Sequence, residues 1–115
     1  MDRMSRPYVP TLPTDSPEEA FQNDTLRPIL KQQDELLRTI FRHYLVKRKV
    51  KPDQLPAAKR SEKIKELVTR DNRLRGLLFG IVVGHFTSEE IAYYVDNESG
   101  VNRRITNLLV ERLTS

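Results

Sequence analysis

Apolar residues recur at steps of three and four along most of this chain, which is the spacing of an amphipathic helix. The longest run starts at Asp24 or Thr25 and predicts a single helix that ends at about Lys49, before Pro52. Its inner positions are Leu26, Ile29, Leu30, Leu37, Ile40, Phe41, Tyr44 and Leu45. A second helix is predicted over residues 56–70. Its inner positions are Ala57, Ala58, Ile64, Leu67 and Val68.

Residues 1–15 predict an extended arm in front of these helices. Pro7, Pro10 and Pro13 recur at the three-residue period of a polyproline helix, and each lacks the backbone N–H that helix or sheet would use. Such a strip could serve as a ligand for an aromatic groove, but we expect a stiff tail that lies over its own domain. Ordered structure is predicted to begin at Ser16, which can cap a short first turn.

The segment RLRGLLFGIVVGHF, which starts at Arg73, is ambiguous because LLFGIVV has the length of a buried strand. A strand needs a partner strand, and no other segment offers one. We therefore expect a helix, capped by Asp71 or Asn72.

Three glycines in this segment, Gly76, Gly80 and Gly84, fall at steps of four and line one face of the predicted helix. Each costs about 1 kcal/mol relative to alanine in a helix. This loss of helix stability predicts close packing of the glycine face against another helix, within the chain or across a dimer. Replacing Gly80 by leucine is then expected to destabilise the fold or dissociate the dimer.

The sequence FTSEEI gives the clearest local signal. Thr87 can cap a helix while Glu90 reaches back to its amide, and Phe86 and Ile91 are spaced as a hydrophobic staple. Turn-forming residues follow, and Ser99 is predicted to cap the last helix. The inner positions of that helix are Val101, Ile105, Leu108, Leu109 and Leu113.

These elements predict an all-α protein: a compact bundle of four to five helices that forms a single domain over residues 16–115. A chain of 115 residues can close such a core without disulfides. The absence of cysteine excludes thiolate metal sites and fits a reducing compartment. No apolar run approaches the roughly 20 residues of a membrane span, and none resembles a secretory signal. We expect a cytoplasmic protein with no membrane partner.

Charge is distributed unevenly within the net +4. Residues 38–75 contain 13 basic and 4 acidic side chains, whereas the segments on either side are net acidic. Such a local excess can attract phosphates or acidic surfaces, although no aromatic residues are interleaved for base stacking, and a solvated face is the alternative. The candidate contacts to an anion or a nucleic acid in this segment are Lys47, Arg48, Lys49, Lys51, Lys59 and Arg60.

Candidate catalytic chemistry is sparse. The two histidines, His43 and His85, lie outside any motif, and convergence with Glu89, Glu90 or Asp96 is not required by their spacing. There is no metal-ligand pattern and no phosphate-binding glycine loop. The sequence therefore predicts no catalytic residue, no metal and no cofactor.

Residues 87–113, TSEEIAYYVDNESGVNRRITNLLVERL, resemble a bacterial helix-turn-helix. The resemblance implies that the second helix contacts the major groove of DNA. The residues it places there are Asn102, Arg103, Arg104 and Asn107. Asp96 stands where such motifs usually have glycine, and residues 76–115 are net acidic, which opposes phosphate contacts.

Over a longer range, the stretches QNDTLRPILKQQDELL, HFTSEEIAYYV and NRRITNLLVERL resemble a family of short bacterial helical proteins, some of which carry the label glyoxalase. Metal-dependent glyoxalases hold their His and Glu ligands on strands, and this sequence predicts neither, so the label assigns a role to no residue. We predict a non-enzymatic interaction or regulatory protein, with a protein partner or a second copy bound by helix packing; nucleic-acid binding is the alternative.

Overall fold

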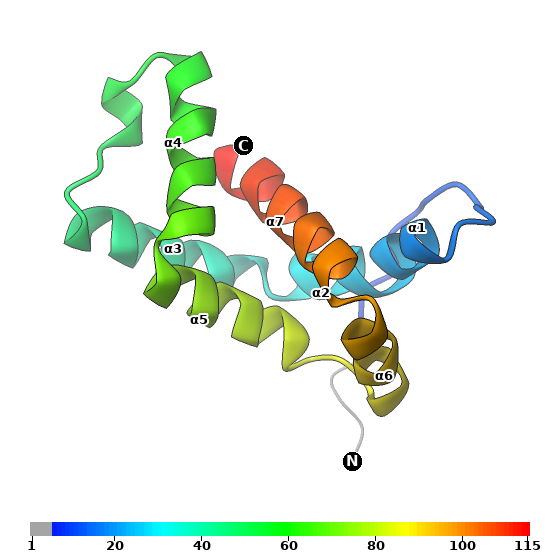
Figure 1. Cartoon of the computed structure of the whole chain (residues 1–115). Coiled ribbons are helices and arrows are strands. Elements are labelled where there is room, and N and C mark those ends of the chain that lie inside the picture. The colour runs from blue at the N-terminus through cyan, green and yellow to red at the C-terminus, as the bar shows by residue number, and fades with distance from the viewer. Residues whose placement is uncertain (1–5) are drawn as a thin grey trace.

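The computed structural model describes residues 6–115, and all regular secondary structure in that range is helical. The elements are α1 (Pro17–Phe21), the π-helical turn η1 (Gln22–Leu26), α2 (Arg27–Gln32), α3 (Asp34–Lys47), the 3₁₀ turn η2 (Pro52–Gln54), α4 (Ala57–Arg70), α5 (Asn72–Val83), α6 (Ser88–Asp96) and α7 (Glu98–Thr114). Figure 1 shows α7 crossing the middle of the molecule, with α4 on one side, α1 and α2 on the other, and α5 below. The predicted all-α bundle is confirmed.

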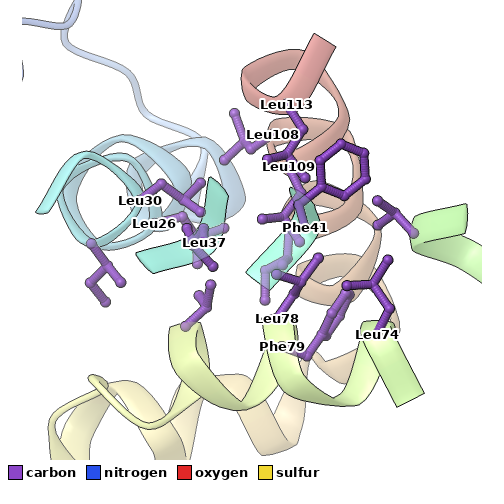
Figure 2. Close-up of a cluster of buried hydrophobic side chains, with 14 of the residues drawn as sticks. Leu26, Leu30, Leu37, Phe41, Leu74, Leu78, Phe79, Leu108, Leu109 and Leu113 are labelled. Atoms are coloured by element: carbon purple, nitrogen blue, oxygen red, sulfur yellow. The ribbon is translucent and has the colours of Figure 1, made fainter. Parts of the chain in front are cut away.

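The core lies where α2, α3, α4, α5 and α7 meet. Figure 2 shows that leucines of α7 and apolar residues of α5 approach each other, with Phe41 of α3 between them. Leu37, Leu74, Leu78 and Leu109 in this cluster are completely buried. Each buried leucine or phenylalanine contributes about 1.5–3 kcal/mol relative to an exposed one, so this cluster is the main source of stability.

The prediction of one continuous helix from residue 25 to 49 is wrong, because the helix breaks at Gln33, where ψ is 12°. Leu30 and Leu37, on either side of the break, are seven residues apart, close to two helical turns. The apolar period therefore continues across the break and gives no sign of it. Despite the break, both leucines belong to one buried cluster (Figure 2).

Helical structure begins at Ser16, as predicted: the Ser16 hydroxyl accepts a hydrogen bond from the Glu19 N–H at 3.3 Å. The predicted second start at Asp24 or Thr25 is wrong, because the turn η1 joins α1 to α2 without a gap. In η1 the Arg27 N–H donates to the Gln22 carbonyl five residues back. The widened turn comes directly before Pro28, whose missing N–H breaks the regular α-helical ladder at that point.

The helix α5 confirms the helical interpretation of LLFGIVV, and Asp71 is its cap: the Asp71 carboxylate accepts from the Leu74 N–H at 3.2 Å. On α4, Ile64 is buried as predicted, but Ala57 and Ala58 are exposed. These alanines lie in the first turn of α4. The end of α7 meets α4 about two turns further along, where Ile64 and Leu113 line the same cleft.

The helix α6 starts as predicted, with both hydrogen bonds of the Thr87–Glu90 capping box in place. Phe86 is fully buried, and its ring packs edge-on against Phe21. The predicted cap at Ser99 is wrong, because α7 already begins at Glu98 and a single residue separates it from α6.

The arm contacts the helical domain through the side chain of Arg6. Its guanidinium donates to both carboxylate oxygens of Glu90, at 2.7 and 2.8 Å, and to the His85 carbonyl. The expectation that the arm lies over its own domain is confirmed at this residue. Between Arg6 and α1 no regular structure forms, and Tyr8 and Leu12 are exposed; residues 1–5 of the predicted arm lie outside the described residues.

Candidate functional site

The face of α5 that carries glycines points to solvent. A Cβ atom placed on Gly76 or Gly80 would meet nothing within 4 Å, and both residues are exposed. The expectation of close packing within the chain is therefore wrong for these two glycines. Leu77, on the same face, is 45% exposed. Packing of this face across a dimer stays a prediction.

Gly84 differs from the other two glycines because its own helix requires it. A Cβ atom there would lie 2.7 Å from the carbonyl oxygen of Gly80, which is closer than real Cβ contacts. Gly84 also donates its N–H to that same carbonyl at 2.8 Å. The end of α5 thus gives an intramolecular reason for Gly84, and none for Gly76 or Gly80.

Two residues of the predicted basic contact surface are used inside the protein. Arg48 donates to the Asp71 carboxylate, with a shortest distance of 2.6 Å, and this bond lowers the pKa of Asp71. Arg60 donates to the carbonyls of Pro52 and Leu55, at 3.1 and 3.3 Å. Both arginines therefore stabilise the connections at the two ends of α4 with part of their donors, and their role in anion binding stays a prediction.

The lysines of that surface remain exposed. Lys47 lies 5.6 Å from the centre of the Tyr44 ring, and Lys59 is 3.9 Å from Glu62 in a largely exposed pair. Lys49 has a φ of 57°, at a helix end where glycine is usual, so its backbone conformation costs about 1–2 kcal/mol. With Lys51 they form a cationic surface without a cavity of its own, and their role in anion binding stays a prediction.

The resemblance of α6 and α7 to a helix-turn-helix is local. Only Asn97 separates the two helices, whereas the turn in such motifs has three or four residues. Two of the four groove residues are bound within the chain: Asn102 accepts from the Tyr94 hydroxyl at 2.6 Å, and Arg104 donates to Gln22 at 3.0 Å.

The other two groove residues, Arg103 and Asn107, are exposed. Arg103 lines a cleft at the α6–α7 corner that also contains Glu18, Asp96 and Glu98. These carboxylates repel phosphate, so the surroundings of Arg103 oppose DNA binding.

The histidines do not form a catalytic pair. His43 is exposed on α3 and packs edge-on against Tyr44, while His85 binds the Ile81 carbonyl through Nδ1 at 2.6 Å. Within residues 6–115 neither imidazole contacts a carboxylate, and no group of three or more His, Asp or Glu side chains is placed to hold a metal ion.

The Glu90 carboxylate binds groups from three segments of the chain, and only its capping role was predicted. It accepts from Arg6 of the arm, from the Thr25 hydroxyl at 3.0 Å and from the Thr87 N–H at 2.8 Å. Burial alone would raise the pKa of Glu90, but these hydrogen bonds outweigh it and lower the pKa to about 2. The carboxylate is therefore charged at neutral pH and ties three segments together.

A second network that the sequence did not reveal joins α3 to the end of α7. Asp34 accepts from Arg38 at 2.9 Å and from Arg112 at 3.0 Å, and Arg38 also donates to the Arg112 carbonyl at 2.8 Å. The negative end of the α7 dipole is thereby met by a cation. The i, i+4 spacing of Asp34 and Arg38 was the one visible signal.

The structure defines an all-α protein in which the candidate site residues are dispersed over several surfaces. Across residues 6–115, no helix combines the length and the apolar character needed to cross a membrane. Comparison of the chain with protein-family models, curated proteins and solved structures found no match. The resemblance to a family of short bacterial helical proteins stays a prediction.

Proposed function

We propose that this protein is a non-enzymatic interaction protein that self-associates through the exposed face of α5. The observation that carries the proposal is the exposure of Gly76 and Gly80. Each costs about 1 kcal/mol in a helix, and nothing inside the described chain approaches closely enough to need a glycine there. Close packing of a second helix against this face would explain why both positions are occupied by glycine.

The charges at the two ends of α5 favour a second copy in antiparallel orientation. Arg73 is exposed in the first turn of α5, and Glu89 is exposed in the first turn of α6. The helix α6 follows the other end of α5 (Figure 1). An antiparallel pair brings each arginine toward the partner's acidic end. Leu77 then packs against the partner's glycine face, which supplies apolar burial at the centre of the contact.

Sedimentation equilibrium of the wild-type chain, Gly80→Leu and Ala58→Leu tests this proposal. The leucine in Gly80→Leu prevents the close approach of the partner's helix and is expected to weaken self-association at least about tenfold. It should not lower the thermal stability of the monomer, because the space next to Gly80 is open. Ala58→Leu adds the same bulk to an exposed site of α4 and should leave association unchanged. A wild-type chain that stays monomeric at all concentrations, or a Gly80→Leu chain that dimerises normally, contradicts the proposal.

The cytoplasmic location and nucleic-acid binding stay predictions. No contact or cavity at Lys47, Lys51 or Arg103 favours nucleic acid over solvent as the neighbour of these side chains.

A further inference from the structure

A cleft of about 350 Å³ opens between α3, η2, α4 and the last turn of α7. This volume lies near the lower end of the range of ligand pockets, roughly 300–1,000 Å³. Part of its lining is apolar and buried, since Phe41, Ile64 and Leu113 are 4%, 2% and 7% exposed. The rest of the lining is rich in guanidinium groups, so apolar surface and positive charge meet in one cavity.

Two of the three arginines in the cleft are held in place by the protein. Arg60 is fixed by the carbonyls of Pro52 and Leu55, and Arg38 by Asp34 and by the Arg112 carbonyl. Because these bonds restrict both side chains before any ligand arrives, little conformational entropy is lost when an anion binds.

The third arginine, Arg42, lies one turn after Arg38 on the same face of α3. It is exposed and forms no ion pair with any residue between 6 and 115. Asp53 is the only acidic side chain among the lining residues. The cleft therefore carries an excess of positive charge. Arg42 is the lining arginine whose guanidinium donors are accessible to a ligand.

We propose that this cleft binds a small monocarboxylate with an apolar body. A guanidinium and a carboxylate match in planar, bidentate geometry, and Arg42 and Arg60 provide the donors. The apolar body of the ligand covers Leu45 and Pro52, the two apolar lining residues that the protein leaves partly exposed above the buried Phe41, Ile64 and Leu113. An inorganic phosphate satisfies the arginines but leaves this apolar surface in water, so it binds more weakly. The cleft shares no residue with the glycine face of α5, so this inference does not depend on self-association.

Titration of the full chain with 3-phenylpropionate, acetate and inorganic phosphate, followed by NMR chemical shifts and calorimetry, tests the assignment. We expect saturable binding of 3-phenylpropionate, at least about tenfold tighter than that of acetate or phosphate, because only its ring reaches the apolar lining. Arg42→Gln should weaken this binding at least about tenfold, since a hydrogen bond to a charged group is lost. The matched control Arg103→Gln removes an exposed arginine outside the cleft and should leave the affinity unchanged.

Three results overturn the proposal. The first is the absence of saturable binding of 3-phenylpropionate. The second is equal or tighter binding of phosphate or acetate, which indicates a site for inorganic anions or for any carboxylate. The third is an equal loss of affinity in Arg103→Gln and Arg42→Gln, which indicates attraction by overall charge. Because Arg42 is exposed, its replacement should not disturb folding, and an unchanged unfolding midpoint verifies this.

Discussion

Glu90 and the exposed face of α5 relate to the rest of the chain in opposite ways. Around Glu90, donors from Arg6, Thr25 and Thr87 converge on one carboxylate, although Arg6 and Thr25 are distant from it in the sequence. Above Gly80, by contrast, nothing lies within 4 Å of where a side chain would begin. Both regions carry residues that are costly in isolation, a partly buried charge in one and helical glycines in the other.

The comparison separates two kinds of unfavourable free energy: one that contacts within the chain offset, and one that no contact within the described chain offsets. The charge of Glu90 is compensated within the chain, so its contacts explain stability and point to no partner. The glycine cost at Gly76 and Gly80 has no compensation among the described residues, so it points outside the chain. Substitutions in the two regions should therefore change stability in opposite directions.

The largest effect is expected for Glu90→Gln. Glutamine keeps the size of the side chain but removes its charge, so Arg6 loses its ion pair and the cap of α6 is weakened. We expect a loss of about 2 kcal/mol in the free energy of unfolding, the combined order of a charged hydrogen bond and a helix cap. Urea unfolding followed by circular dichroism measures it.

The neighbouring residue offers a matched control. Glu89→Gln removes the same charge from the same helical turn, but Glu89 is exposed, and we expect a change within about 0.5 kcal/mol. Equal losses in the two variants would mean that the contacts of Glu90 contribute no more than the general attraction of a helix start for negative charge.

The second expectation concerns pH. The pKa of Glu90 is about 2 in the folded protein, against its ordinary value of 4.5. Between these values the unfolded chain binds more protons than the folded chain at this site, so the contribution of Glu90 is complete above pH 4.5 and disappears as the pH falls toward 2. Urea unfolding across this range should show the stability falling with decreasing pH.

Comparison with Glu90→Gln isolates this contribution. The pKa values of Asp34 and Asp71 are also lowered by their arginine partners, so the wild-type protein loses stability in acid for several reasons. The variant lacks only the part that belongs to Glu90. The stability gap between wild type and variant should shrink as the pH falls toward 2, and a constant gap contradicts the role assigned to this carboxylate.

What could be predicted around Glu90 separates local from distant causes. The Thr87–Glu90 capping box lies within four adjacent residues, and a short motif of known geometry was enough to predict it. Arg6 lies 84 residues away, and no pattern in one sequence brings it to that carboxylate. The same holds for Arg48, whose acidic partner Asp71 is 23 residues further along the chain. Composition reveals the charge of an arginine but not its partner.

The helices show the same limit. Hydrophobic period predicted the class of the fold and the helical state of α5, because burial of one face determines both. It missed the break at Gln33, where the period runs on unchanged, and it placed Ala57 and Ala58 inside, where no neighbour reaches them. The arginine-lined cleft depends on α3, α4 and α7 meeting at one point, so only Arg60 of its three arginines had been selected as a candidate.

The smallest effects are expected on α5 itself, and their signs separate its glycines. Gly80→Ala should stabilise the monomer by up to about 1 kcal/mol, because alanine is the better helix former and its Cβ meets nothing within 4 Å. Gly84→Ala should destabilise it by about 1 kcal/mol, because its Cβ would lie 2.7 Å from the Gly80 carbonyl and the helix end must shift.

Thermal unfolding of both variants at concentrations where the chain is monomeric measures this difference. Stability changes of opposite sign mean that the geometry at the end of α5 requires Gly84, whereas Gly80 lowers the stability of the monomer. If Gly80→Ala is also destabilising, the exposed face of α5 has an intramolecular role, and the case for a second copy on that face loses its basis. If both substitutions are stabilising, the helix end relieves the close contact at Gly84 without loss of stability. Gly84 would then have no intramolecular cause, as is already the case for Gly76 and Gly80.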